Sequence, residues 1–469
     1  MKRALPWLLG AALASAATPA AANGRFPQAN QIAFDFALGA DVVARTTFGV
    51  LVSHDRGATF HWVCEQAVGY SGNQDPGIGL FSDGAIAVAS FEGLALTHDG
   101  GCSWAFVGAG LANEYVIDVA VERASPLRGV AVTSTGMPGG TFHVQAWGTV
   151  DGGATWAPRG AQLPSDLLAE TIDVAPSDPM RLYVSGVFFD PAKAKHGAVE
   201  VSQDGGTSWT RTVVDLKTDA SIFIAGVDPS DASRVYARTR GSGKDGAGSG
   251  NVDRLLVSKD GGGSFQEVAA LPGPLAGFAV SPDGKRVAIG SQGAGLLFAS
   301  RDDLAFVQVA AKAVQCLAWS PDGLYVCGSD FADGYVIART TDEGKTFTPL
   351  IRALANVGGP LTSCAPGGQY QALCAPAWPV LQQQYGIGTA GGAGGAGGGP
   401  GGGAGAVGGA GSGGASTAGS PPASAKSGCS CAVLPARGPL EGPLLCLAGA
   451  IFAASRRKRR DSARAAVRE

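Results

Sequence analysis

One stretch of eight residues decides the fold of this chain: Ser202-Gln203-Asp204-Gly205-Gly206-Thr207-Ser208-Trp209. Its pattern is Ser or Thr, any residue, Asp, any residue, Gly, any residue, Ser or Thr, and an aromatic residue. The pattern occurs cleanly six times, at residues 53–60, 97–104, 149–156, 202–209, 258–265 and 340–347. A degraded seventh copy, residues 300–306, lacks the glycine and is one residue short. The chain is therefore built from a repeated unit.

Each copy predicts a tight turn between two strands. The Asp carboxylate accepts backbone N–H groups, the Ser or Thr hydroxyl closes the same turn, and glycine takes a positive φ. The aromatic residue then begins the outgoing strand and packs between neighbouring units. We call this eight-residue element a box turn and expect a structural role for its aspartates, which are Asp55, Asp99, Asp151, Asp204, Asp260, Asp302 and Asp342.

The spacing of these aspartates predicts the architecture. They follow one another at intervals of 40 to 56 residues, and the segments between them read as short strands, such as residues 181–186 and 324–328. Units of about four strands at this spacing are typical of a β-propeller with one blade per unit. We expect an all-β, seven-bladed propeller over residues 23–386, with no long amphipathic helix between the box turns.

These units resemble the Asp-box (BNR) repeats of sialidase-like, sortilin-like, xyloglucanase-like and photosystem-assembly-factor-like propellers. The resemblance implies that the box turns lie at the periphery, away from the central channel where ligands bind, so none of the box aspartates is expected to be catalytic. Several such propellers are non-catalytic. The resemblance therefore favours a module that binds an unidentified protein or glycan.

A sialidase-like glycoside hydrolase acting at the channel is the alternative. That activity needs an arginine cluster, a Tyr/Glu nucleophile pair and an acid/base Asp. The family's Arg-Ile-Pro element has only Arg25-Phe26-Pro27 as its nearest counterpart here. Candidate acids are Glu65, Glu92, Glu114 and Glu170, but no spacing in the sequence gathers them with three arginines. We therefore expect no catalytic residue and no cofactor. We also expect no metal site, since the five histidines form no ligand pair.

Charge argues against a nucleic-acid partner. The formal net charge is -3, but the two N-terminal basic residues and a basic segment after residue 390 leave the middle of the chain strongly acidic. An acidic domain repels phosphate backbones. The 16% content of charged residues also excludes a coiled coil and a charge-driven disordered chain.

The first 22 residues read as a secretory signal, with Lys2 and Arg3, an apolar run and small residues before a cleavage site at Asn23. Export permits disulfides. Cys316 and Cys327 flank one turn, and Cys364 and Cys374 flank another, so we expect both of these pairs to be bridged. Cys64 and Cys102 then pair by exclusion, although other connectivities stay open.

The chain beyond residue 386 divides into three segments. Residues 387–428 are a Gly/Ala/Ser-rich linker, residues 429–460 carry an apolar stretch and an arginine cluster, and residues 461–469 are a tail. Gly-Cys, apolar stretch and arginine cluster together resemble the myxobacterial C-terminal sorting signal (MYXO-CTERM). This resemblance implies membrane association, processing near Cys429 and Cys431 by a sorting protease, and display at the cell surface or outer membrane, or release from it. A basic tail without a sorting role is the alternative.

Overall fold

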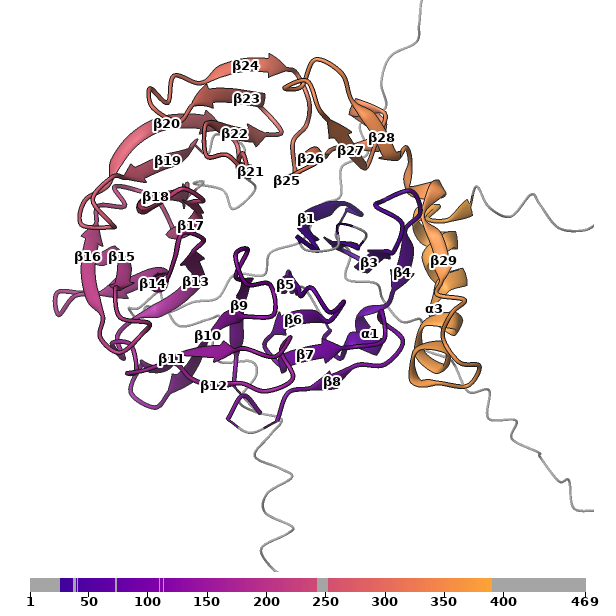
Figure 1. Cartoon of the computed structure of the whole chain (residues 1–469), viewed down its shortest axis with the longest axis horizontal. Coiled ribbons are helices and arrows are strands. Elements are labelled where there is room, and N and C mark those ends of the chain that lie inside the picture. Colours follow the sequence, from indigo (N-terminus) through magenta and orange to yellow (C-terminus); the bar gives the residue numbers. More distant parts are fainter. Residues whose placement is uncertain are drawn as a thin grey trace, which may run out of the picture. The chain divides into compact units, whose positions relative to one another are not determined.

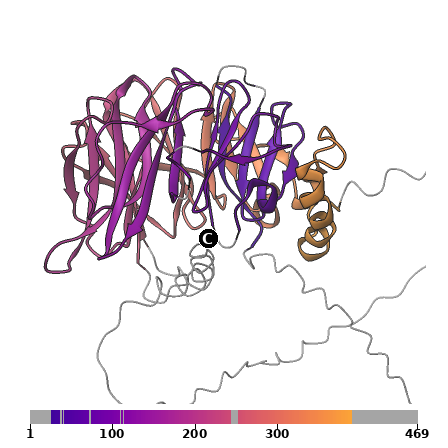
Figure 2. The same ribbon diagram turned by 90° about the horizontal axis from the view of Figure 1, so that it is seen from below.

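The structure, a computed structural model, describes residues 26–389 except for 37–38, 40, 72–73, 109, 113 and 243–251. Its strands form seven sheets arranged around a central axis, each built on four antiparallel strands, so the fold is the expected seven-bladed β-propeller. Figure 1 shows the blades in sequence order around the ring, and Figure 2 shows the disc from the side. The expected signal peptide and the segments after residue 389 lie outside the described residues.

Each blade contains four consecutive strands. In all seven blades the strand numbers rise from the channel outward. Blades 1 to 4 comprise β1 (Ala29–Phe34), β2 (Val42–Thr46), β3 (Gly49–Ser53), β4 (His61–Val63); β5 (Gly77–Leu80), β6 (Ile86–Ser90), β7 (Gly93–Thr97), β8 (Ala105–Phe106); β9 (Val116–Val121), β10 (Gly129–Met137), β11 (Thr141–Thr149), β12 (Ala157–Pro158); and β13 (Leu168–Ala175), β14 (Asp178–Phe189), β15 (Lys195–Ser202), β16 (Thr210–Val214).

Blades 5 to 7 comprise β17 (Ser221–Asp228), β18 (Asp231–Arg240), β19 (Val252–Ser258), β20 (Gln266–Pro272); β21 (Leu275–Val280), β22 (Arg286–Ser291), β23 (Gly295–Ser300), β24 (Val307–Ala310); and β25 (Cys316–Ser320), β26 (Gly323–Cys327), β27 (Ile337–Thr340), β28 (Thr348–Ile351). Short helices α1 (Glu65–Val68) and α2 (Asp330–Asp333) follow β4 and β26. The blades pack face to face through apolar side chains, because each sheet has two apolar faces to bury.

The two faces of the disc follow from strand register. Ser53, at the end of β3, pairs with Val42, which pairs with Phe34 at the end of β1. The turns between third and fourth strands, which are the box turns, therefore lie where the innermost strands end. We call this side the box face. The opposite side, where the innermost strands begin, is the mouth face.

A segment after blade 7 departs from the expected all-strand pattern. Residues 354–389, the C-terminal strap, contain the 3-10 helix η1 (Leu354–Asn356), β29 (Gly358–Pro360) and the 17-residue helix α3 (Gln369–Tyr385). β29 adds to the outer edge of blade 1 by pairing in parallel with β4. Figure 1 shows α3 outside the ring, beside β29. Ile387 is buried as well, so the packed residues continue past 386.

The disulfides correct two of the three expected pairings. Cys316 and Cys327 are bridged as predicted, on opposed positions of one hairpin. Cys64 instead pairs with Cys374, and Cys102 pairs with Cys364. The prediction for Cys364 and Cys374 was wrong because Cys374 lies in α3 rather than on a strand facing Cys364.

Candidate binding site at one mouth of the central channel

The six complete box turns have nearly the same hydrogen bonds. In the turn of Asp204, the Ser202 hydroxyl donates to Oδ1 at 2.8 Å and accepts the Gly206 N–H at 2.7 Å. Oδ1 also accepts the Ser208 N–H at 2.9 Å, and Oδ2 accepts the Ser208 hydroxyl at 2.6 Å. The same set recurs around five further aspartates, Asp55, Asp99, Asp151, Asp260 and Asp342.

These bonds favour the charged carboxylate. The hydroxyl of Ser208 and its backbone N–H lower the pKa of Asp204 to about 2, and Ser264 has the same effect on Asp260. The aromatic side chains behave as predicted too. Trp156 is buried in a cluster that includes Phe81 of blade 2 and Trp147 of blade 3. The box turns thus tie strands and blades together and do not reach the channel.

The degraded box turn differs. The Asp302 side chain is 81% exposed and lies 3.6 Å from the Arg301 guanidinium. Asp303 accepts the Ala305 N–H at 3.1 Å in its place, and Leu304 takes the positive φ of 51°. Since Ala305 has no hydroxyl and the turn is one residue short, the expected structural role of Asp302 is not met.

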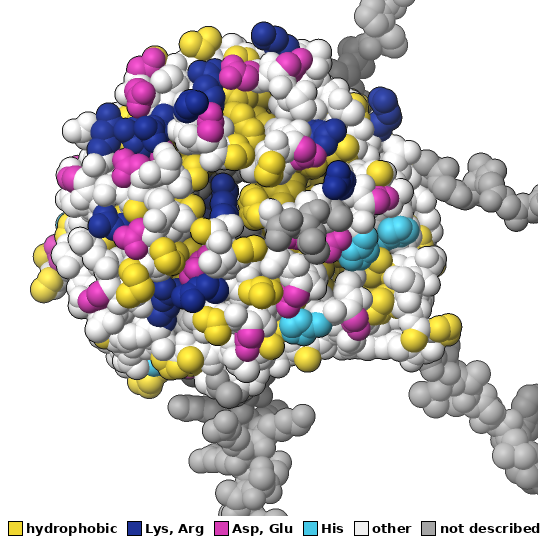
Figure 3. Space-filling view, viewed as in Figure 1, with side chains coloured by type: hydrophobic (Ala, Val, Ile, Leu, Met, Phe, Trp, Pro, Cys, Tyr) yellow, Lys and Arg dark blue, Asp and Glu magenta, His cyan; other side chains and the backbone are white. Residues whose placement is uncertain are grey.

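Two connected cavities occupy the channel. The larger, about 880 Å³, opens at the mouth face, because its lining residues belong mostly to the beginnings of the innermost strands and to the ends of the second strands beside them. A smaller cavity of about 270 Å³ lies toward the box face and shares Gln31 and Phe278 with the larger one. In the face drawn in Figure 3, apolar side chains gather around the centre, and Lys and Arg side chains form separate groups between centre and rim. The larger cavity is the candidate site.

Three arginines line this mouth cavity: Arg45, Arg238 and Arg240. Arg45 is engaged with Asn30, whose Oδ1 accepts from Nε at 2.7 Å. Arg238 and Arg240 alternate along β18 and both lie over the ring of Phe223, at 4.8 and 5.4 Å from its centroid. Such cation–π contacts orient the guanidinium groups without neutralising them.

The two arginines of β18 are held without a close ion pair among the described residues. Arg238 donates to the Leu275 carbonyl oxygen at 3.1 Å, and among the described residues neither Arg238 nor Arg240 has a carboxylate within ion-pair distance. Burial and the positive charge of Arg240 lower the pKa of Arg238 to about 10. Adjacent like charges in a low-dielectric cleft attract an anion.

Glu170 is the only one of the four candidate acids that lines this cavity. Its Oε1 accepts the Ser221 hydroxyl at 2.6 Å. Burial raises the pKa of Glu170, while the Ser221 hydrogen bond and the charges of Arg240 and Arg238 oppose that rise. None of the other three acids lines the cavity: Glu65 begins α1, Glu92 accepts from the lining residue Gln74, and Glu114 faces His143 and Thr135.

Two channel aspartates are committed to the backbone. Asp118 accepts the Val119 N–H on Oδ1 at 2.9 Å and the Ile172 N–H of the next blade on Oδ2 at 3.1 Å. Burial nevertheless raises the pKa of Asp118 to about 7. Asp173, in the smaller cavity, accepts the Val174 N–H at 2.8 Å, and burial raises its pKa to about 6. Asp118 thus connects blade 3 to blade 4.

The described residues that line the channel lack one residue type that a sialidase-like site requires. Among the residues lining the two channel cavities there is no tyrosine. In the part of the chain that the structure describes, no three His, Cys, Asp or Glu side chains are placed to hold a metal ion. Of the described helices, none has both the length and the apolarity needed to cross a bilayer.

Comparison with known proteins shows no family for this chain. No family model matches the chain, and no curated protein matches it. Similar solved structures include the GH74 enzyme of Niastella koreensis, 13% identical over 68% of this chain and 71% of that chain with a TM-score of 0.29. Kuenenia stuttgartiensis hydrazine synthase is 14% identical over 67% and 96%, with a TM-score of 0.43. YCF48 bound to D1 peptide is 18% identical over 50% and 66%, with a TM-score of 0.32. The fold and the mouth cavity define this chain as a seven-bladed propeller with a basic channel mouth.

Proposed function

We propose that this chain is an exported, surface-displayed propeller that binds a protein or glycan at the mouth face without catalysing a reaction. The observation that carries the proposal is the pair Arg238 and Arg240 on the ring of Phe223, in a cavity of about 880 Å³. This arrangement suits a ligand that bears a carboxylate, because guanidinium groups bind planar anions by two hydrogen bonds.

Neighbouring apolar side chains support a ligand larger than an ion. Phe91 lines the mouth cavity and is exposed, and its ring centroid lies 5.8 Å from that of Tyr115, which is also exposed. Phe331 in α2, which belongs to the mouth-face connection between β26 and β27, is 96% exposed. Exposed aromatic residues beside arginines are typical of binding surfaces.

The state of the channel carboxylates supports a non-catalytic role. A general acid or nucleophile must reach the reacting atoms. Asp118 has each of its oxygens within hydrogen-bond distance of a backbone N–H, and Asp173 accepts a backbone N–H as well. Glu170 is held by Ser221. Asp118 and Glu170 thus take part in contacts between neighbouring blades.

A sialidase-like hydrolase is the second candidate, and the three arginines at one mouth favour it. Arg45, Arg238 and Arg240 supply the positive charge that a sialic acid carboxylate requires, and Glu170 lies in the same cavity. A fluorogenic sialoside tests this candidate directly. Turnover by the wild-type chain that is lost in Glu170→Gln would establish it and overturn the non-catalytic proposal.

Export is proposed from the leader-like N-terminus and is supported by the three disulfides of the described residues. Disulfides persist in oxidising compartments. The surface location, and the sorting protease acting near Cys429 and Cys431, rest on the tail sequence, which lies outside the described residues. Intact-mass measurement of the protein from its native host, beside Cys429→Ala, tests that part.

To find the ligand, the full chain from an oxidising host is screened against carboxylated and neutral glycans and against acidic and neutral peptides. We expect retention by carboxylated members of one of the two sets, and loss of that retention in Arg240→Ala. Retention by neutral members alone would contradict the proposed role of the arginines.

A further inference from the structure

At one of the seven blade-to-blade seams, the chain does not pass from one blade into the first strand of the next. Each blade is made of consecutive strands, so the polypeptide itself crosses the other six seams, as between β4 and β5. At the seventh seam β1 of the first blade meets β25 and β26 of the last. Contact there includes the rings of Phe34 and Tyr325, whose centroids are 4.6 Å apart. No strand is exchanged between these two sheets.

The C-terminal strap crosses this seam on the outside of the ring. After β28 the chain pairs β29 with β4 of blade 1, so the outer edge of blade 1 is covered. The Tyr370 hydroxyl donates to the Trp62 carbonyl oxygen and accepts the Leu361 N–H at 2.7 Å. Trp378 of α3 packs against Trp62, with ring centroids 5.3 Å apart.

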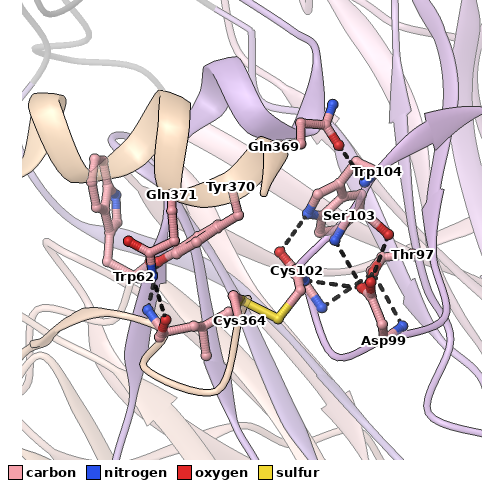
Figure 4. The surroundings of a disulfide bond; sticks show 12 residues. Trp62, Thr97, Asp99, Cys102, Ser103, Trp104, Cys364, Gln369, Tyr370 and Gln371 are labelled. Carbon is pink, nitrogen blue, oxygen red and sulfur yellow. Dashed lines mark hydrogen bonds between the residues drawn. A yellow bond between two sulfur atoms is a disulfide. The ribbon is translucent and has the colours of Figure 1, made fainter. Parts of the chain in front are cut away.

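Both long-range disulfides fasten the strap. Cys374 in α3 is bonded to Cys64, which directly precedes α1 in blade 1. Cys364 is bonded to Cys102, inside the box turn of blade 2. Figure 4 shows this second bridge beside Asp99 and beside Gln369, whose Oε1 accepts the Trp104 N–H at 3.0 Å. The strap therefore runs from blade 7 across blade 1 to blade 2.

We propose that the strap is an oxidation-dependent clasp that closes the propeller ring, and that its two disulfides hold the end of the chain to blades 1 and 2 across the seventh seam. Each bridge forms when two thiols of the chain react by exchange with an external disulfide. One S–S bond forms in the chain, one breaks in the oxidant, and two electrons and two protons pass to the oxidant, which becomes two thiols. The ring is then locked only after the chain reaches an oxidising compartment.

The bridges are placed to hold blades rather than a single hairpin. The bonded residues are 310 and 262 positions apart in the sequence, so the bridges enclose nearly the whole ring. The Cys316–Cys327 bridge spans 11 positions inside blade 7 and crosses no seam. Long enclosed loops restrict the unfolded and partly opened chain most.

Closure of the ring also matters for the mouth cavity. Its lining includes Arg45 of blade 1, Glu170 of blade 4, Arg238 of blade 5 and Leu317 of blade 7. A seam that opens beside Arg45 would change the separation of these side chains. The clasp thus connects the redox state of the strap to the geometry of the proposed binding site, although it does not depend on that site being correct.

Hydrogen exchange with mass spectrometry on the full chain tests the clasp. The wild type is compared with Cys64→Ala/Cys374→Ala/Cys102→Ser/Cys364→Ser and with the matched control Cys316→Ala/Cys327→Ala. In the four-site variant we expect exchange of β1 and β25 amides to rise about tenfold while β14 and β15 in blade 4 remain as protected as before. The control is expected to keep wild-type protection at β1.

Folded wild-type protein treated with a phosphine reductant provides the second arm, so the test does not depend on the folding of the variant. We expect the same selective loss of protection at the seventh seam after reduction. Unchanged exchange at β1 and β25 in reduced protein would overturn the proposal. An equal increase in all seven blades would overturn it as well, because the bridges would then stabilise the domain in general and not the seam.

Discussion

Cys64 and Cys374 form a disulfide although 310 positions separate them, and Cys64 donates its backbone N–H to the partner sulfur at 3.1 Å. Both residues are fully buried between blade 1 and α3. The end of the propeller is therefore fixed to its beginning by a covalent bond inside the apolar core. The helix that carries Cys374 belongs to the folded domain and is not a linker.

Removal of the buried box-turn hydroxyl is expected to destabilise the propeller. Ser202→Ala leaves the buried Gly206 N–H without its acceptor and removes a donor to Asp204. We expect a loss of about 1 to 3 kcal/mol in the free energy of unfolding, measured by denaturant titration. Asp302→Ala in the degraded turn is the matched control and is expected to leave stability unchanged. Equal losses in both variants would contradict the structural role of the complete box turns.

The box aspartates are expected to make the stability of the folded chain depend on pH. The pKa of Asp260 is lowered to about 2 in the folded chain, from an ordinary value of 3.8. A lowered folded-state pKa contributes stability that is present above the unfolded-state pKa and is lost as pH falls through the folded-state pKa. The difference in melting temperature between wild type and Asp260→Asn should therefore be full at pH 6 and shrink between pH 4 and pH 2. Asp302→Asn should show no difference at any pH, and a pH-independent difference for Asp260→Asn would refute the ionic explanation.

Gly205 and Gly206, which are consecutive in one box turn, are expected to differ in how much a substitution destabilises the fold. Gly206 has a φ of 96°, and a Cβ there would lie 2.4 Å from the Arg159 carbonyl oxygen, so Gly206→Ala should cost about 2 kcal/mol or more. The preceding position, Gly205, corresponds to Arg56 and Glu343 in other box turns, which adopt positive φ as non-glycine residues. Gly205→Asn is accordingly expected to cost less than Gly206→Ala. The melting temperatures of the two variants test this prediction. A larger loss in Gly205→Asn than in Gly206→Ala would contradict the close contact of Gly206 with the neighbouring blade.

Local chemistry made most of the fold predictable from sequence. A box turn closes by hydrogen bonds among residues at most four apart, so Asp55 and Asp342 could be placed in turns, and the intervals between copies gave the number of blades. Helix α3 was missed because Pro376 and Pro379 lie inside it and because Pro366-Gly367-Gly368 is typical of a hairpin turn. The pairing of Cys64 with Cys374 depends on that helix.

The candidate site was harder to predict because it is assembled from several blades. Arg45, Glu170 and Arg240 come from three different repeats, and no local spacing connects them. One signal was present: Arg238 and Arg240 alternate with Thr239 at the end of a strand, directly after the apolar run 235–237, which puts two positive charges on one side of that strand. An arginine pair at the mouth-face end of a blade could have indicated the binding surface.

Arg240→Ala should separate binding from stability. The Arg240 side chain is exposed, and among the described residues it has no carboxylate within ion-pair distance, so its removal is expected to change the free energy of unfolding by less than about 0.5 kcal/mol. Arg238→Ala should lower stability more, because Arg238 also donates to the Leu275 carbonyl oxygen of blade 6. Chemical denaturation of the two variants measures this difference. A large destabilisation by Arg240→Ala would mean that this arginine has a structural role.

The most direct test of the central claim measures binding and turnover of the same carboxylated ligand. Wild type, Arg240→Ala and Lys285→Ala are titrated with the best-retained carboxylated glycan or peptide by isothermal calorimetry, and the mixture is analysed for cleavage by mass spectrometry. Lys285 is the matched control because it is an exposed cation in the turn between β21 and β22 on the box face. We predict that Arg240→Ala weakens binding at least tenfold, that Lys285→Ala binds like wild type, and that the ligand remains intact. Equal binding by Arg240→Ala and wild type, or cleavage of the ligand by wild type, would contradict the account of a non-catalytic propeller that binds its ligand at the arginine-bearing mouth.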